Sequence, residues 1–270
     1  MSRRSTVGVI GVGAMGEALV SGLLAAGWGP DEVSLCVRRV DRADELAHRT
    51  GCDVSLDPVV AIADRDAVVV AVKPRDVLEV LKTISGHVSE SQVVVSLAAG
   101  VTTATYESQL GAVPVVRAMP NTPALVREGV TGIAPGSHAG TAHLDVAREL
   151  LGAVGSVRIM EETLMDAVTA VSGTGPAYVF LLAEALTEAA MREGLPRDVA
   201  ESFVHQTIRG AGHLLTDTDM SPARLRHEVT SPGGTTAAAM HVLEEKGFRA
   251  IVEDAVRAAA IRARELGGDI

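Results

Sequence analysis

The sequence predicts an α/β fold, in which a doubly wound parallel sheet is followed by a separate all-helical domain. In the first half, short runs of β-branched residues alternate with helical patterns. Beyond about Glu161 the strand-like runs stop, and helical patterns continue to the end of the chain. Apolar strands separated by helices are typical of a parallel sheet covered on both faces. We therefore expect one domain over residues 1–161 and a second over residues 162–270.

The strands of the predicted sheet are short runs rich in valine. They are Thr6–Ile10, Glu32–Val37, Asp66–Val72, Gln92–Ala98 and Val113–Met119. Helical periodicity fills the intervals between them, as in Ala14–Ala26 and Arg75–Ile84. Weaker strand-like segments near Gly132–Ala134 and Ser156–Ile159 are expected to extend one edge of the sheet.

The second domain is predicted to consist of helices alone. Their expected ranges are Gly175–Glu193, Arg197–Leu215, Pro222–Thr230, Thr235–Glu245 and Phe248–Leu266. The stretch Pro176–Met191 is apolar almost all round, which is typical of a buried helix. A helical segment of this kind often hides one face in a partner subunit, so we expect this domain to mediate dimerisation.

The composition excludes several classes of partner. A net charge of −10 argues against general binding of nucleic acid, and a 2% aromatic content leaves few platforms for base stacking. The two cysteines form no CxxC pair, and no cluster of histidine, cysteine and acidic residues indicates a metal site. The longest apolar run is too short to span a bilayer. We expect a soluble cytoplasmic protein without a membrane or nucleic-acid partner.

The segment GVGAMG follows the first predicted strand and opens the first predicted helix. Gly11 suits a tight turn, Gly13 lets the backbone approach a pyrophosphate, and Gly16 lets the helix pack closely on the sheet. Ala14 and Met15 contribute backbone N–H groups at the positive end of the helix dipole. This context favours a Rossmann-type dinucleotide site, although the glycines alone also suit an ordinary tight turn.

Two arginines follow the second predicted strand, where an NAD-binding protein usually carries an acidic residue. Arg38 and Arg39 would attract the 2′-phosphate of NADPH, which a carboxylate would repel. The pair therefore favours NADPH over NADH, with NADH still possible. A pair of solvated surface arginines is the alternative interpretation.

Further segments follow the ends of other predicted strands and are expected to line the cofactor crevice. The expected cofactor contacts there are Ala71, Val72, Lys73, Pro74, Leu97, Ala98, Ala99 and Asn121. Lys73 is equally consistent with a plain surface lysine, and the small residues of Leu97–Gly100 are equally consistent with an ordinary turn. Asn121 lies in the corner MPNTP, which two prolines stiffen and which therefore suits the orientation of a ligand.

The segment TSPGGTT at Thr230–Thr236 holds more hydroxyl and glycine residues than a helix start requires. A helix cap beside a glycine turn would account for one threonine and one glycine. The segment SGTGPAY at Ser172–Tyr178 is a second candidate cradle of backbone amides, because its glycines and hydroxyls precede an apolar helix.

Taken together, these segments resemble the pyrroline-5-carboxylate reductase family. The matching motifs are GVGAMG, AVKP, LAAGVT, RAMPNTP, SGTGPAY and TSPGGTT with the helix that follows it. They span nearly the whole chain in the order of the family, and TSPGGTT is the most specific of them. The chain reads SGTG where many members read SGSG, which exchanges one hydroxyl residue for another.

The resemblance implies NAD(P)H-dependent reduction of the imine of 1-pyrroline-5-carboxylate to L-proline by direct hydride transfer, the last step of proline biosynthesis. It implies that the helical domain interleaves with a partner's to form a homodimer, and that five dimers form a decamer in many members. It also implies a substrate site and its residues. They are Ser231, Gly233, Gly234, Thr235 and Thr236, with the Thr236 side chain at the ring nitrogen, and Asp219 near the amine.

Two other functions are alternatives to this one. A β-hydroxyacid dehydrogenase also joins a Rossmann domain to helices, but it carries a catalytic lysine on the first long helix after a glycine-rich turn. The corresponding stretch here, GPAYVFLLAEAL, contains no lysine. A non-catalytic NADPH-binding module is a further alternative, against which the intact TSPGGTT segment argues.

Overall fold

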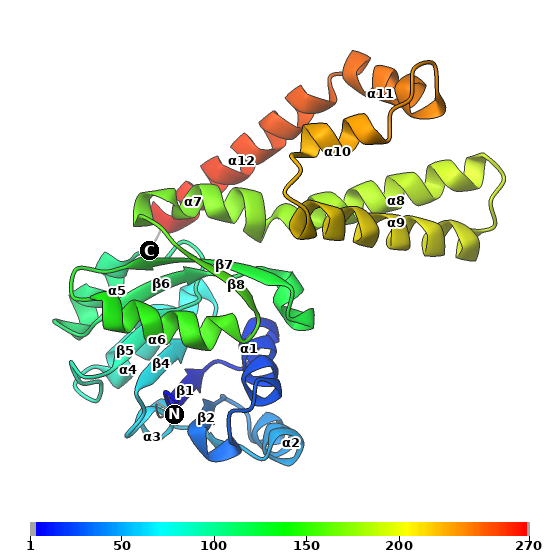
Figure 1. Cartoon of the computed structure of the whole chain (residues 1–270). Coiled ribbons are helices and arrows are strands. Elements are labelled where there is room, and N and C mark those ends of the chain that lie inside the picture. Colours follow the sequence, from blue (N-terminus) through cyan, green and yellow to red (C-terminus); the bar gives the residue numbers. More distant parts are fainter. Residues whose placement is uncertain (1–3, 269–270) are drawn as a thin grey trace. The chain divides into compact units, whose positions relative to one another are not determined.

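The computed structural model describes residues 4–268 and divides the chain into two compact units (Figure 1). Unit 1 contains the residues up to Thr174 together with those from Ala259 onward. Unit 2 is the segment Gly175–Ala258 between them. The chain therefore crosses from one unit to the other twice.

Unit 1 is built on an eight-stranded sheet with the order β3-β2-β1-β4-β5-β6-β7-β8. The strands are β1 Val7–Ile10, β2 Val33–Cys36, β3 Asp53–Ser55, β4 Ala67–Val70, β5 Val93–Ser96, β6 Val115–Met119, β7 Gly129–Pro135 and β8 Gly155–Ile159. All neighbouring pairs from β3 to β6 are parallel. The predicted doubly wound α/β fold is confirmed, and each of the predicted strand runs contains one of these strands.

The sheet differs from the sequence prediction at both edges. The edge strand β3 was not predicted, because its three residues are exposed or half-buried and carry no apolar run. At the other edge, β7 runs antiparallel to β6, and β8 runs parallel to β7. The segment joining β6 to β7 holds only the short 3₁₀ turn Thr122–Val126. A parallel crossover needs a dozen or more residues, so this short connection reverses the strand.

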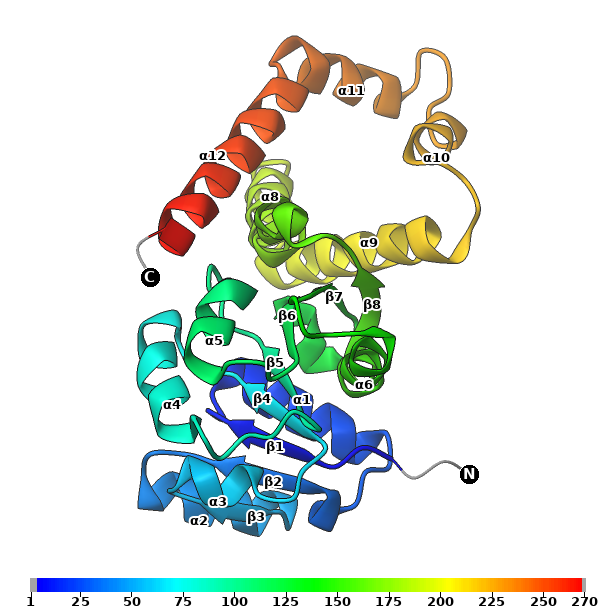
Figure 2. The same cartoon turned by 90° about the vertical axis from the view of Figure 1, so that its left-hand side faces the viewer.

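Helices cover both faces of the sheet. They are α1 Ala14–Ala25, α2 Val40–Thr50, α3 Pro58–Ile62, α4 Val77–Ile84, α5 Thr103–Leu110 and α6 Thr141–Gly152. Alternate residues of β1 serve the two faces, because Val9 packs in a core with Leu19 and Leu150, whereas Ile10 packs in a core with Leu81. Figure 2 shows α4 and α5 on one side of the sheet and α6 on the other. Cover on both faces explains why the central strands β1, β4 and β5 are almost wholly apolar and fully buried.

A cluster of charged side chains joins the sheet to the segment that leaves it. Arg117 on β6 is 6% exposed, and its guanidinium lies 3.3 Å from Glu162 and 3.7 Å from Asp166. The Glu162 carboxylate also accepts hydrogen bonds from the backbone N–H and the hydroxyl of Thr103, at 2.8 Å and 2.6 Å. Glu162 thus accepts hydrogen bonds from the first turn of α5 and also pairs with Arg117. After α7 (Met165–Val168), the π-helical turn η5 (Thr169–Gly173) leads to the boundary of unit 1.

Unit 2 consists of helices, as predicted. They are α8 Gly175–Arg192, α9 Arg197–Asp217, α10 Pro222–Glu228, α11 Thr235–Glu245 and the first part of α12, Phe248–Gly268. The prediction that the apolar stretch Pro176–Met191 is buried is wrong for the single chain, because Phe180 and Leu181 are 61% and 66% exposed. Burial on all sides needs facing elements, and α8 packs mainly against α9 within this unit.

Within residues 4–268, no helix is long and apolar enough to cross a membrane.

Candidate active site

The glycine loop between β1 and α1 has the geometry that the sequence predicted for it. Gly11 has a φ of +91°, and a Cβ atom there would lie 2.7 Å from Cγ1 of Val72. A Cβ atom on Gly16 would collide with the carbonyl oxygen of Gly11. Gly11 therefore makes the turn, and Gly16 brings α1 close to the loop.

Gly13 differs from the other two glycines of the loop, because the space beside it is open. No atom lies within 4 Å of a Cβ placed there. Gly13 is also the N-cap of α1, and as a glycine it has no side chain to accept a hydrogen bond from the first turn. Free N–H groups at a helix start, with open space in front of them, are suited to the pyrophosphate of a dinucleotide. The residues present therefore fit such a cofactor.

The ends of four neighbouring strands lie side by side at the glycine loop. Gly11 N–H donates to the carbonyl of Cys36 at 3.0 Å, and Ala71 N–H donates to the carbonyl of Ile10 at 2.8 Å. Leu97 N–H likewise donates to the carbonyl of Val70 at 2.9 Å. The structure thus gathers the ends of β2, β1, β4 and β5 at one edge. The predicted cofactor segments begin at Ala71 and Leu97, directly after the ends of β4 and β5.

Each of the two predicted 2′-phosphate residues lies close to a carboxylate of the chain. The Arg38 side chain is 82% exposed and lies 3.6 Å from Asp76, whose other oxygen lies 3.8 Å from Arg75. The Arg39 side chain is 72% exposed and donates two hydrogen bonds to Asp41, at 3.1 Å and 2.9 Å. Both guanidinium groups are open to solvent, so exposed pairing of this kind holds them only weakly.

Asp76 and Arg75 were missed by sequence reasoning. They follow the AVKP motif and are thirty-seven or more positions from Arg38 in the chain, so only the adjacency of β2, β1 and β4 brings them together. Lys73, which sequence reasoning included, is exposed at the start of the same 3₁₀ turn, where its carbonyl accepts a hydrogen bond from Asp76 N–H at 2.9 Å. Pro74 is the first residue of that turn.

The turn after β5 is closely packed. Ala98 is 2% exposed, Leu97 and Ala99 are half-buried, and Gly100 has a φ of +79°. A Cβ atom on Gly100 would lie 3.3 Å from the backbone nitrogen of Gly267, near the end of α12. Small residues are therefore required here by the return of the chain from unit 2.

Asn121 connects two motifs that lie about fifty residues apart. It is 9% exposed, its side-chain oxygen accepts a hydrogen bond from Val130 N–H at 2.9 Å, and its amide nitrogen donates to the carbonyl of Ser172 at 3.2 Å. A Cβ atom on Gly173 would lie 2.6 Å from Cε of Met119. The corner MPNTP and the turn SGTG are thus packed on each other, which no local sequence pattern could indicate.

The TSPGGTT segment in unit 2 forms a second helix start without a side-chain cap. Gly234 is the N-cap of α11, so Thr235 and Thr236 are its first helical residues. Gly233 has a φ of +70°, and a Cβ atom on Gly234 would collide with the hydroxyl of Ser231. Ser231 is therefore folded back beside the helix start, and the hydroxyl of the half-buried Thr236 is not used as a cap.

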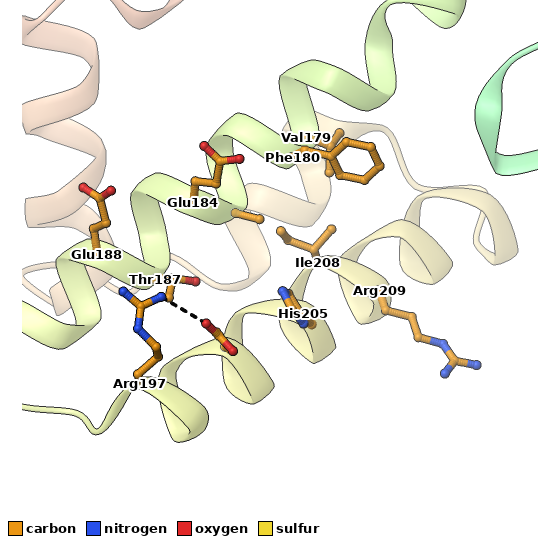
Figure 3. Close-up of a pocket in the computed structure, with 11 residues that line it drawn as sticks. Val179, Phe180, Glu184, Thr187, Glu188, Arg197, His205, Ile208 and Arg209 are labelled. Carbon is orange, nitrogen blue, oxygen red and sulfur yellow. Dashed lines mark hydrogen bonds and ion pairs between the residues drawn. The ribbon is translucent and has the colours of Figure 1, made fainter.

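Asp219 is exposed in the turn between α9 and α10. Elsewhere in unit 2, a groove of about 790 Å³ runs between α8 and α9. Val179, Phe180 and Ile208 line one part of it, whereas Arg197 pairs with Glu201 at 3.2 Å in another part (Figure 3). The groove is open in the single chain and lies among the exposed apolar residues of α8.

Buried thiols supply no nucleophile. Burial, together with the nearby charge of Asp57, raises the pKa of Cys36 to about 11, and burial also raises the pKa of Cys52. Both thiols therefore stay protonated near neutral pH. Over the part of the chain that the structure describes, no group of three or more histidine, cysteine or acidic side chains is placed to hold a metal ion.

A doubly wound sheet with an uncapped, glycine-initiated helix at its carboxyl edge defines the class of dinucleotide-binding proteins. Residues 6–100 match the family model described as NADP oxidoreductase, coenzyme F420-dependent. Residues 162–266 match the model described as pyrroline-5-carboxylate reductase dimerisation.

Comparison with known proteins gives the particular family. The chain is 42% identical to the pyrroline-5-carboxylate reductase of Corynebacterium melassecola, with 97% of this chain and 99% of that protein covered. It is 40% identical to the enzyme of Pseudomonas aeruginosa, with 96% of each covered. The chain belongs to the pyrroline-5-carboxylate reductase family.

Solved structures agree with this assignment. A pyrroline-5-carboxylate reductase from Coxiella burnetii is 38% identical, with a TM-score of 0.94 over 98% of this chain and 99% of that one. A pyrroline carboxylate reductase from Plasmodium falciparum, whose structure contains NADP, is 29% identical, with a TM-score of 0.86 over 97% and 98%.

Proposed function

We propose that this protein reduces the imine of 1-pyrroline-5-carboxylate to L-proline with NADPH. The observation that carries the proposal is family membership over almost the whole length of the chain. The geometry supports it at two places, since α1 and α11 both begin at glycine N-caps without a side-chain cap. Each unit thus offers one helix start for an anionic group.

NADPH, when bound, supplies the hydride that the imine carbon accepts. In unit 1, the backbone N–H groups at Ala14, Met15 and Gly16 hold the pyrophosphate, beside the open space at Gly13. Arg38 and Arg39 attract the 2′-phosphate. The segments that begin at Ala71 and Leu97 line the same edge of the sheet.

In unit 2, the start of α11 receives the substrate carboxylate. The N–H groups of its first turn and the hydroxyl of Ser231 donate hydrogen bonds to the carboxylate oxygens, and the absence of Cβ atoms at Gly233 and Gly234 leaves the backbone accessible. The Thr236 hydroxyl hydrogen-bonds the ring nitrogen, and Asp219 is a further candidate near the amine.

The chain's own contribution to the chemistry is orientation. A protonated iminium is already a good hydride acceptor, so the protein needs no strong acid in the site. Holding two reactants in a near-attack geometry supplies most of the acceleration, because it converts an encounter in solution into a unimolecular step. The rigid helix starts and the packed turns at the sheet edge suit that task.

We propose that the functional domains are residues 1–161 and 162–270. The match of residues 162–266 to the dimerisation family supports this division. The compact units divide elsewhere, at Thr174 and Ala259. The helical domain forms a homodimer, and five dimers form a decamer. The open groove and the exposed apolar side chains of α8 support an oligomer, since an isolated chain would leave them in water. We place the protein in the cytoplasm, which cell fractionation would test.

Purified protein provides the test of the function. NADPH absorbance should fall only when 1-pyrroline-5-carboxylate is added, and L-proline should accumulate in equal amount. A parallel reaction with NADH measures the cofactor preference, and a β-hydroxyacid with NADP⁺ serves as the control for alcohol oxidation. NADPH binding without proline formation would instead support a non-catalytic cofactor-binding protein.

A further inference from the structure

Ser172 carries a hydroxyl group that the chain does not use. Over the residues that the structure describes, Ser172 Oγ is the buried side-chain polar atom without a hydrogen-bond partner. Buried polar groups in folded proteins are almost always paired, because an unpaired hydroxyl loses its bonds to water without replacement. An orphan hydroxyl therefore points to a missing partner.

The neighbouring hydroxyls on the same turn do have partners within the chain. Thr169 Oγ1 donates to the carbonyl of Met165 at 2.8 Å, and Thr174 Oγ1 donates to the carbonyl of Thr169 at 3.0 Å. These bonds stabilise the π-helical turn Thr169–Gly173. Turns of this type are rare and occur frequently at functional sites. Ser172 is thus the exception on a turn that is otherwise satisfied.

The backbone of Ser172 is held in place from the sheet. Asn121 donates to the Ser172 carbonyl at 3.2 Å, and Asn121 is itself fixed by Val130 N–H at 2.9 Å. On the next residue, Gly173 packs against Met119 at the end of β6. The hydroxyl is therefore attached to a rigid part of unit 1, which suits a group that positions a ligand.

The position of Ser172 along the sheet indicates which part of a dinucleotide it would meet. Asn121 follows β6, and β6 lies beyond β4 and β5 from β1, with all four strands parallel. Three strand spacings place this exit about 14 Å from the glycine loop along the same edge. The 2′-phosphate residue Arg38 follows β2, on the opposite side of β1. Ser172 thus lies toward the nicotinamide half.

We propose that the Ser172 hydroxyl is the hydrogen-bond partner of the nicotinamide carboxamide. This inference rests on the proposed function. A carboxamide offers both a donor and an acceptor, and a hydroxyl can pair with either. Such a bond would fix the rotation of the nicotinamide ring, and hence the face from which hydride leaves. Ser172 is therefore proposed as a residue that binds and orients the cofactor.

Binding of two ligands that differ only in the nicotinamide tests the inference. Calorimetry should show that Ser172→Ala weakens the binding of NADP⁺ by about threefold to tenfold, the effect of one lost hydrogen bond. Binding of 2′-phospho-ADP-ribose, which lacks the nicotinamide, should be unchanged. Unchanged binding of both ligands, or equal weakening of both, would overturn the proposal.

Thermal unfolding without ligand provides the control. Ser172→Ala removes an unpaired group, so its Tm should be equal to or higher than that of the wild type. Thr169→Val removes a paired hydroxyl from the same turn, so it should lower Tm while leaving the ratio of the two ligand affinities unchanged. A lowered Tm for Ser172→Ala would mean that the hydroxyl already has a partner in the free protein.

Two further results separate the possible failures. If the wild type binds NADP⁺ and forms proline but Ser172→Ala binds both ligands normally, only the role of Ser172 is refuted. If the wild type does neither, the proposed function itself fails. A change in oligomeric mass on Ser172→Ala, measured by light scattering, would assign the hydroxyl to a subunit contact and would also refute the proposal.

Discussion

Gly234 is the N-cap of α11, so neither Thr235 nor Thr236 has to cap the helix. At the residue scale, this assignment separates two roles that the sequence could not distinguish. Replacing a threonine that caps a helix by alanine lowers the stability by about 1 kcal/mol. Thr236 lies in the first turn, two residues after the N-cap, and its hydroxyl does not cap the helix, so it has no such structural role. Replacing Thr236 should therefore weaken the interaction with the substrate and leave the stability of the fold unchanged.

Thr236→Ala should lower kcat/KM for the imine by roughly tenfold to a hundredfold, since one hydrogen bond in a dry site is worth on the order of 1–3 kcal/mol. Steady-state kinetics with NADPH measures this loss, and NADPH affinity should barely change. Thr236→Ser keeps the hydroxyl and should keep much of the activity. A lowered Tm with turnover of the folded enzyme intact would contradict the catalytic role.

Arg38 and Arg39 should decide the choice of cofactor. Replacing both by alanine removes the cations expected at the 2′-phosphate, so kcat/KM with NADPH should fall roughly tenfold, a discounted value for exposed charges. The value with NADH should change little. Arg148→Ala, which removes a half-exposed arginine from α6, is the matched control. Equal losses with both cofactors would refute the assignment.

At this scale, the sequence could predict a residue where one local pattern determined its surroundings. The glycine loop is such a case, because the spacing of Gly11, Gly13 and Gly16 sets the turn, the open space and the close approach within a few residues. The contacts of Asp76 with Arg38 and of Asn121 with Ser172 could not be predicted. Each joins segments that only the order of the strands brings together.

At the scale of elements, strands and helices with strong periodicity were predictable, whereas short edges and strand direction were not. Every helix of unit 2 begins at its expected residue, because Pro and Gly mark these starts and stops. The strand β3 has too few apolar residues to be recognised. The reversal of β7 depends on the length of a connection, and its strand-like residues carry no information on direction.

The charged cluster of Arg117, Glu162 and Asp166 is predicted to stabilise the packing of the elements that it joins. Glu162→Ala leaves the buried Arg117 with only the more distant Asp166 and takes the acceptor from the first turn of α5. The free energy of unfolding should fall by about 2–4 kcal/mol. Urea denaturation measures this loss.

Glu161→Ala is the matched control for that measurement. Glu161 is exposed and lies beside Glu162 in the chain, so its removal should change stability by less than about 0.5 kcal/mol. Similar losses for the two variants would show that the cluster adds nothing beyond a surface charge.

At the scale of the whole molecule, the apolar faces of unit 2 require a second chain. The uniform apolarity of α8 predicted burial, yet Phe180 and Leu181 remain 61% and 66% exposed among the described residues 4–268. The sequence of a helix indicates which apolar face must be buried. It does not indicate whether the covering surface belongs to the same chain or to a partner. The match of residues 162–266 to a dimerisation family agrees with this interpretation.

Leu181→Glu should therefore weaken subunit association at least tenfold, because a charge would enter an apolar contact. Light scattering over a dilution series measures the change. Val60→Glu is the matched control, since Val60 is similarly exposed, at 63% against 66%, but lies on α3 of unit 1. Equal dissociation of both variants would mean that the effect is not specific to α8.

The return of the chain to unit 1 through α12 makes unit 2 an insertion whose two ends are anchored in the same body. A protease that cuts the exposed turn near Asp219 would therefore produce two fragments that remain associated. The C-terminal piece would stay attached because the end of α12, from Ala259 to Gly267, belongs to unit 1, where Ala263 is buried and Gly267 packs against Gly100. Nicked protein should run as two bands on a denaturing gel and elute as one species from a native column. Release of the smaller piece under native conditions would show that the covalent link alone had kept it in place.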